Sequence, residues 1–203
     1  MMRAPIGLAV LAAALALSGC GAALSLSRAS ESLDSYTLPP LPGTGTAGGS
    51  RHLMVDVATA GGAIATDRIL IKPSPVQAQY LPDARWSDPA PVLVQSLLLG
   101  SLQDAGGFRL VTREAAGLVP DYSLMTDLRA FQAEVSPGQA PTVRVDLALT
   151  LIRETDRAIL STRRIETRAA AASDKTGDLV AAFEVATTQA LGQAVDWVRS
   201  RAR

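Results

Sequence analysis

The chain has 203 residues, of which 48% are apolar, so it is long enough for one domain with a substantial core. This apolar fraction is close to the globular average, which argues against a disordered chain and against a multi-pass membrane protein. Its 19 basic residues balance 19 acidic ones, so no charge excess indicates nucleic acid as a partner, and no lysine or arginine run indicates an anionic membrane surface.

The first 19 residues have the features of a bacterial export signal. Arg3 supplies positive charge, and residues 6–17 form an uninterrupted apolar or small-residue run. This run is too short to span a bilayer, which needs about 20 residues. It ends at Leu17-Ser18-Gly19-Cys20, which resembles a lipobox, where the cysteine thiol accepts diacylglycerol. Since Cys20 is the only cysteine, it cannot form an internal disulfide. We therefore predict a lipoprotein signal peptide over residues 1–19 and lipidation at Cys20; the alternative is an ordinary secretory signal that happens to contain a cysteine.

Residues 20–32 are predicted to be the lipidated N-terminus and a tether, because they are small and polar, and residues 33–203 are predicted to be a single domain. A dozen flexible residues reach roughly 20 Å on average. Several acyl chains, such as palmitate, would anchor the protein stably, whereas a single chain is marginal. Gly21 follows the cysteine. An aspartate there resembles an inner-membrane retention signal, so its absence favours the outer membrane, with the domain facing the periplasm.

The first half of the domain is predicted to contain short strands separated by loops. The segment 39–50 holds three prolines and four glycines and is predicted to be a flexible linker. Its Gly43-Thr44-Gly45 resembles part of a phosphate-binding loop, but only weakly, because no Lys-Ser/Thr follows it. Alternating apolar residues predict the following strands: 32–38; 52–59, with Leu53, Val55 and Val57 on one face; 64–72, ended by Pro73 and Pro75; and 76–81, as the hairpin partner of 64–72.

A helix follows over residues 90–105, with Asp88 as its N-cap and Gly106-Gly107 as its C-cap. It is apolar nearly all round, so we expect it to be buried on more than one side. A second helix is predicted from Gly177 to the C-terminus, capped by Asp178 and carrying an apolar stripe from Leu179 to Val198. Strands are predicted between the two helices: 108–112; 122–135, with a β-bulge near Ala130-Phe131; 143–152, the strongest alternation; and 158–169. This order predicts an α/β fold, with a mixed β-sheet and two main helices packed against it.

Residues that could carry chemistry are scarce. His52 is the only histidine and lies at the edge of a predicted strand, so a Ser/His/Asp triad finds little support. One lipidated cysteine and one histidine cannot form the usual Cys/His zinc site. Two of four acids could in principle form a hydrolase pair: Asp121, Asp127, Glu134 and Asp146. The simpler interpretation is that they form ion pairs on the surface, because acids and bases are equal in number. We predict no catalytic, metal or cofactor site, and therefore no enzyme.

One cluster of aromatic and arginine residues precedes the first helix. Tyr80, Arg85 and Trp86 lie in one short segment of a chain that is only 4% aromatic. Because such residues are favoured in interfaces, we predict a partner-binding role for them. The alternative is a structural corner, in which Trp86 covers the sheet and Arg85 pairs with an acid.

The same cluster belongs to a series of motifs that resembles a known family. After the lipobox the series runs as follows: Tyr36-Thr37-Leu38, the Pro/Gly linker, Val55-Asp56-Val57, Asp67-Arg68-Ile69, Tyr80 with Arg85-Trp86, Asp121-Tyr122-Ser123-Leu124, and Phe131. In order and spacing, over roughly residues 20 to 200, it is similar to the ABC-type transport auxiliary lipoprotein component family, a PqiC-like and MCE-associated group. One departure is that residues 58–62 replace the usual proline after the second strand.

The resemblance implies a periplasm-facing accessory lipoprotein of a lipid transport system, without catalytic activity. Its partners would be the MCE-type periplasmic protein and the ABC permease and ATPase of the same system, and also the membrane, through acyl chains on Cys20. Some family members assemble into rings, so a homo-oligomeric ring is implied as well. Docking would use the Tyr80–Trp86 region or an exposed helix surface. A second hypothesis is a stand-alone lipid-binding or envelope-assembly lipoprotein whose first helix lines a cavity. The third is a cell-wall enzyme, for which the sequence nominates no residue.

Overall fold

The computed structural model of the chain describes residues 33–45, 48–114 and 117–202. Cys20, the predicted signal peptide and the predicted tether lie outside the described residues. Asp34–Arg203 form one compact unit, and the description that follows concerns this unit.

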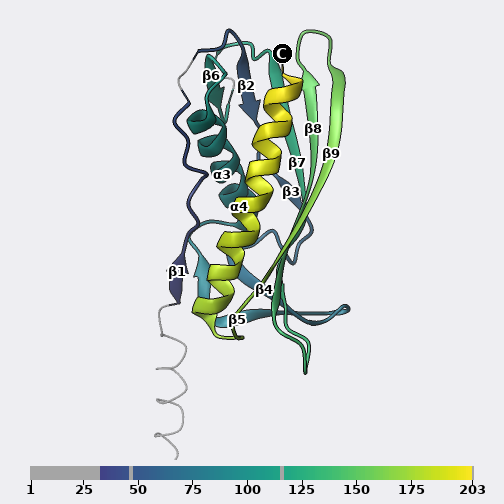
Figure 1. Cartoon of the computed structure of the whole chain (residues 1–203). Coiled ribbons are helices and arrows are strands. Elements are labelled where there is room, and N and C mark those ends of the chain that lie inside the picture. The colour runs from purple at the N-terminus through teal and green to yellow at the C-terminus, as the bar shows by residue number, and fades with distance from the viewer. Residues whose placement is uncertain (1–32, 46–47, 115–116, 203) are drawn as a thin grey trace, which may run out of the picture. The chain divides into compact units, whose positions relative to one another are not determined.

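The described strands form one mixed sheet around the long strand β7 (Tyr122–Glu134), as predicted (Figure 1). On one side β7 pairs antiparallel with β8 (Thr142–Arg153), which in turn pairs with β9 (Ala158–Ala170). The other edge of β7 is shared by three short parallel strands in succession: β2 (His52–Val55), β3 (Thr59–Ala60) and β4 (Arg68–Ser74). Beyond them lie β6 (Leu110–Thr112) against β2, β5 (Gln77–Trp86) against β4, and β1 (Asp34–Tyr36) against β5.

A bulge in β7 decides which side chains face the helices. Leu128 pairs with Leu147, whereas Ala130 pairs with Asp146, so one extra residue lies between the two pairs. Because side chains alternate along a strand, one inserted residue moves all later side chains to the opposite face. Phe131 therefore points into the core. The predicted bulge is confirmed at this position.

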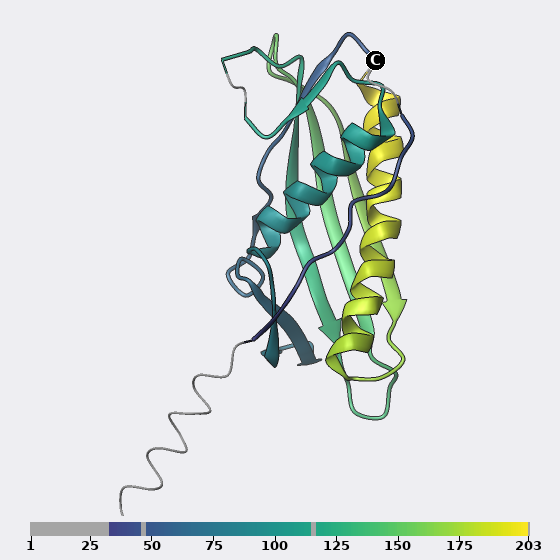
Figure 2. The same ribbon diagram turned by 90° about the vertical axis from the view of Figure 1, so that its left-hand side faces the viewer.

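Two helices cover one face of the sheet and pack against each other (Figure 2). Helix α4 (Thr176–Arg201) lies over β8 and β9, and α3 (Ala90–Ala105) lies beside β2 and β6. The predicted stripe of α4 is buried from Leu179 to Val198. Neither of these helices is long and apolar enough to cross a membrane, and the described part of the chain contains no other candidate.

The N-caps predicted for the two helices are wrong. The structure has Pro89 and Lys175 at these positions, and neither forms a side-chain cap hydrogen bond. Asp178 lies instead in the first turn of α4, where its negative charge is favoured by the helix dipole. The predicted glycine at the end of α3 is confirmed, since Gly106 is the C-cap with a φ of 67°.

Residues 39–45, the first part of the Pro/Gly segment, form an extended strap along the C-terminal half of α3 (Figure 2). The Leu41 amide donates to Ser101 Oγ at 2.9 Å, and a Cβ on Gly45 would lie only 2.1 Å from the Ala105 carbonyl oxygen. Glycine is required there because backbone passes directly against backbone. The predicted loop is confirmed, but the prediction that it is a flexible linker is wrong. The strap covers the second side of α3, as the helix's broad apolar pattern predicted.

Several strand boundaries also differ from the prediction. β1 covers only Asp34–Tyr36. β2 ends at Val55, so Val57, predicted to share a strand face with Leu53 and Val55, lies beyond the strand and is 52% exposed. β4 begins at Arg68 and continues through Pro73. Proline is tolerated there because β4 pairs with β7 only as far as Lys72, so no ladder hydrogen bond from residue 73 to β7 is lost.

Candidate functional site

The three residues predicted to bind a partner are divided between the core and the surface. Trp86 is only 1% exposed. Its ring packs against Phe131, at 5.3 Å between centroids, and edge-on against Phe183 at 5.1 Å. Arg85 lies 3.8 Å from Asp67, with half of its side chain exposed. Trp86 and Arg85 thus form the structural corner that was the alternative to partner binding. Arg85 and Tyr80 nevertheless remain accessible to solvent.

Tyr80 stands at the base of the hairpin formed by β4 and β5. Its hydroxyl donates to the Ala63 carbonyl oxygen at 3.2 Å. The Arg68 guanidinium lies 5.8 Å from the ring centroid and donates to the Leu81 carbonyl oxygen at 2.9 Å. These contacts hold the base of the hairpin in place while 38% of Tyr80 remains exposed.

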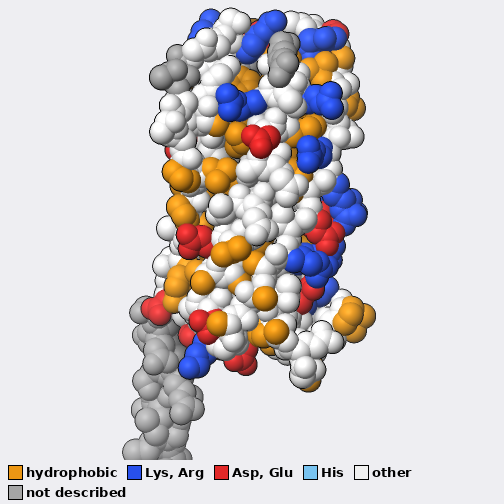
Figure 3. Space-filling model, in the orientation of Figure 1, with side chains coloured by type: hydrophobic (Ala, Val, Ile, Leu, Met, Phe, Trp, Pro, Cys, Tyr) orange, Lys and Arg blue, Asp and Glu red, His pale blue; other side chains and the backbone are white. Residues whose placement is uncertain are grey.

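Beyond Lys72 the hairpin leaves the sheet. We call residues 73–79 the hairpin tip; they have no partner in β7, and Ser74 pairs with Gln77 across a Pro75-Val76 turn. Two-residue hairpins favour turns with positive φ, but Arg157 is the one non-glycine residue with positive φ in the described part of the chain. A proline in the turn fits instead a turn with negative φ. Val76 is 97% exposed, and Figure 3 shows apolar side chains at the end of this projection.

A cleft of about 410 Å³ separates the hairpin from the end of β7. Its lining comes from both sides: Lys72, Ser74 and Pro75 on the hairpin, and Gln132, Glu134, Ser136 and Arg144 across from them. Lys72 forms no ion pair with any described residue. The cleft therefore offers a free ammonium group beside an arginine and a carboxylate.

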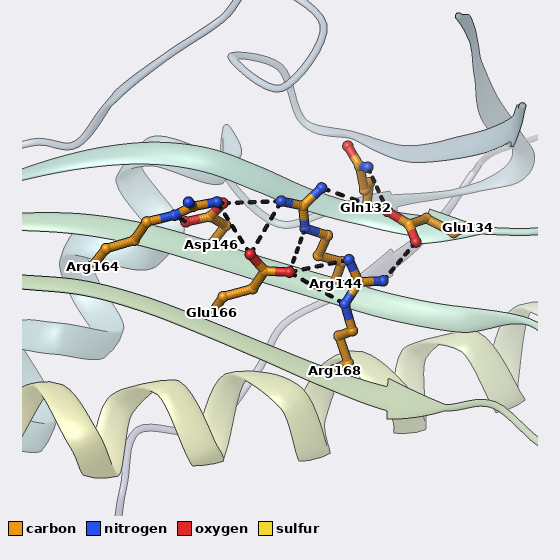
Figure 4. Close-up of polar contacts among 7 residues, drawn as sticks. All are labelled: Gln132, Glu134, Arg144, Asp146, Arg164, Glu166 and Arg168. Carbon is orange, nitrogen blue, oxygen red and sulfur yellow. Dashed lines mark hydrogen bonds and ion pairs between the residues drawn. The ribbon is translucent and has the colours of Figure 1, made fainter. Parts of the chain in front are cut away.

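The uncovered face of the sheet next to the cleft carries a charge lattice from β7, β8 and β9 (Figure 4). It consists of three acids and three arginines: Glu134, Asp146, Glu166, Arg144, Arg164 and Arg168. Asp146 accepts from Arg164 Nε at 2.9 Å and Nη2 at 2.6 Å, and from Arg144 at 3.2 Å. Arg168 bridges Glu134 at 2.9 Å and Glu166 at 3.0 Å.

The lattice favours the charged form of two of its acids, Asp146 and Glu166. The hydrogen bonds from Arg164 lower the pKa of Asp146 and outweigh burial, which acts in the opposite direction. Burial likewise favours a higher pKa for Glu166, but hydrogen bonds from Arg168 and Arg144 outweigh it, so that this pKa is also lowered. A general acid needs a raised pKa. The lattice is therefore an internally paired polar surface, and the lowered pKa values of Asp146 and Glu166 do not suit the role of a general acid.

The other residues weighed for chemistry lie apart from the lattice. His52 is fully buried, with Nε2 2.8 Å from Thr112 Oγ1. Its amide donates to Asp121 Oδ2 at 2.7 Å, and Asp121 also accepts from Arg51 at 3.2 Å. Asp127 lies exposed in the middle of β7. Within the described residues, no group of three or more His, Cys, Asp or Glu side chains could hold a metal ion.

The sequence model of the ABC-type transport auxiliary lipoprotein component matches residues 36–195. The chain belongs to this family. The family prediction made from the order of the motifs is thereby confirmed, and the protein is an auxiliary component of an ABC-type transport system. No curated protein matches the chain in sequence.

Solved structures have the same fold. A Xanthomonas campestris protein of the DUF330 family is 24% identical, with a TM-score of 0.74 over 84% of this chain and 96% of that one. An uncharacterized protein is 15% identical, with a TM-score of 0.64 over 83% and 99%. The hypothetical protein CT253 from Chlamydia trachomatis is 7% identical, with a TM-score of 0.52 over 75% and 97%. At these identities the likeness concerns the fold alone.

The charge lattice and the cleft were missed by the sequence reasoning, although the lattice left a signal. Arg144 and Asp146 alternate in one predicted strand, and Arg164, Glu166 and Arg168 alternate in its predicted antiparallel neighbour. Charges at every second position of two paired strands must share one face. The cleft left no comparable signal, because it depends on where the hairpin leaves the sheet.

Proposed function

We propose that this protein is the non-catalytic accessory lipoprotein of an MCE-linked lipid transport system. In this proposal acyl chains on Cys20 hold it in the outer membrane, and its domain docks the periplasmic MCE-type protein of that system. The observation that carries the proposal is the family match over residues 36–195. Since an auxiliary component acts by binding other components, an exposed binding surface is the feature that the proposal requires.

The base of the hairpin supplies such a surface. Tyr80 is held by its hydrogen bond to Ala63 yet stays 38% exposed, and fixed aromatic side chains are favoured at the centres of interfaces. The ion pair of Arg85 with Asp67 is long, at 3.8 Å, and half exposed. Such a pair is weak, so Arg85 can exchange Asp67 for an acid of a partner.

The stand-alone lipid-binding hypothesis requires α3 to line a cavity. Its apolar residues are instead packed into the core, since Leu97 is 2% exposed and Leu98 and Leu102 are fully buried. This packing supports the accessory role over the alternative.

Site-specific cross-linking in the native membrane tests the proposal. A photoreactive residue at position 80 should cross-link an MCE-type protein, its permease or its ATPase, identified by mass spectrometry after detergent extraction. The same residue at position 159, on β9, is the control, because Ile159 is also exposed, at 65%, and does not lie on a helix. Recovery of the lipoprotein without any component of such a system would contradict the proposal.

A double substitution measures how much the surface contributes. Tyr80→Ala with Arg85→Ala should lower recovery of the partner at least about tenfold, because each interface anchor contributes more than about 1 kcal/mol. Arg163→Ala is the matched control, since Arg163 is exposed and has no ion pair with a described residue. Equal recovery by both variants would remove the hairpin base from the interface.

A further inference from the structure

We propose that the hairpin tip, residues 73–79, contacts the lipid surface of the membrane that holds the acyl anchor. This inference rests on the acylation of Cys20 in the proposed function. It adds a second membrane contact, made by the folded domain itself.

The composition of the hairpin suits a lipid surface. No charged residue occurs between Lys72 and Asp83. Val76, at the end of the turn, is 97% exposed, and it contributes nothing to the core. A fully exposed apolar side chain at the end of a projecting, uncharged element is available for insertion between headgroups.

The residue that precedes the tip suits the polar headgroup layer of a membrane. Lys72 lines the cleft without an ion pair to any described residue, so its ammonium group is free to meet a lipid phosphate while its apolar stem stays against the protein. The apolar tip and the lysine that precedes it thus match the apolar interior and the charged headgroup layer of a membrane.

The length of chain before the domain brings this hairpin within reach of the anchor. Residues 21–32 separate Cys20 from the described chain, and twelve residues span at most about 40 Å. The chain then enters the fold at Asp34, opposite Ala84 of β5. From Ala84 back to Val76, β5 is shortened by irregularities in its pairing with β4, so it covers less than the about 26 Å of a regular strand at 3.3 Å per residue. The chain before the domain is therefore long enough for the tip to reach the surface in which the anchor lies.

The anchor also explains why a small apolar tip is sufficient. Once acyl chains hold the domain at the membrane, contact of the tip is intramolecular and has a high effective concentration. A shallow contact that would not bind a free protein is then populated. It would orient the domain with the hairpin tip toward the lipid and the opposite end of β7 toward the periplasm, and it leaves Tyr80 and Arg85, at the base of the hairpin, to the partner.

A fluorescent probe on the full acylated protein tests this contact. Cys20 is the only cysteine, so after acylation the variant Val76→Cys has a single free thiol for an environment-sensitive dye. Val119→Cys is the matched control, because Val119 is also exposed, at 83%, and precedes the opposite end of β7. Both proteins are reconstituted into phosphatidylethanolamine vesicles with a minor share of phosphatidylglycerol. Lipid-borne nitroxide should quench the dye at position 76 at least about twofold more than at 119, because interfacial elements bury about 5–10 Å.

The outcomes separate the contact from the anchor. Equal quenching at positions 76 and 119 in protein that floats with the vesicles would overturn the inference and leave the acyl anchor intact. Protein without an acylated N-terminal peptide, detected by mass spectrometry, would overturn the anchor itself. The dye at position 76 could instead report an apolar environment that increases with protein concentration and is not quenched by lipid-borne nitroxide. This result would overturn the inference as well, and would indicate that a second copy of the chain covers the tip.

Discussion

The two faces of the sheet exclude water by different means, and adjacent residues of β8 show the contrast. Val145 and Asp146 are each 1% exposed. Val145 is covered by the packed core, whereas Asp146 lies on the uncovered face and is screened by Arg144 and Arg164. On the helix-covered face, side chains are buried by close packing of apolar groups. On the lattice face, they are buried beneath ion-paired side chains. Loss of a side chain should therefore have very different consequences on the two faces.

The largest effect is expected in the aromatic cluster of the helix-covered face. Phe183 is fully buried between Trp86 and Phe131, at 5.1 and 5.0 Å between centroids. Phe183→Ala should lower the free energy of unfolding by about 3–5 kcal/mol, because it removes apolar contacts and leaves a cavity. Denaturant titration measures this loss. Val185→Ala, two positions away on the exposed side of α4, should change stability by less than about 0.5 kcal/mol.

A smaller loss of stability is expected where the strap packs along α3. Gly45→Ala would place a methyl group against the Ala105 carbonyl oxygen, and the backbone must shift to relieve it, at a cost of about 1–3 kcal/mol. At Gly61 an added Cβ meets nothing within 4 Å. Gly61→Ala is therefore the control, and thermal unfolding should show it unchanged or slightly more stable. Equal melting temperatures for both variants would mean that the strap is not packed on α3 in solution.

The lattice face should respond least, and in a pH-dependent way. Asp146→Asn should cost about 1–2 kcal/mol at neutral pH, since hydrogen bonds to a charged group are lost but Arg164 is half exposed. The pKa of Asp146 is lowered by folding. Its stabilisation is thus complete above the unfolded value of about 3.9 and is lost as the pH falls through the folded pKa. Acid titration of unfolding should show a shallower loss below about pH 4 for Asp146→Asn than for the natural chain. Parallel curves would contradict the role assigned to the lattice.

Predictions based on local pattern proved accurate. The limits of α3, the stripe of α4, the alternation of β8 and the bulge in β7 all appear at or close to the predicted residues. Each of these features depends on a period of side chains or on a nearby glycine, which the sequence displays directly. The family followed in the same way, from short motifs in a consistent order.

Contacts between distant segments could not be predicted in this way. From the sequence alone, the glycines before Arg51 are compatible with a flexible linker. Only the structure shows that they lie against the end of α3, because close contact between backbones cannot be predicted from composition. Trp86 could have faced a partner or the core, and the packing of Phe131 and Phe183 decided it. By itself the sequence determined the main elements and the family, and it predicts the lipid anchor. The tertiary structure decided which surfaces are open, because exposure is a property of what other segments cover.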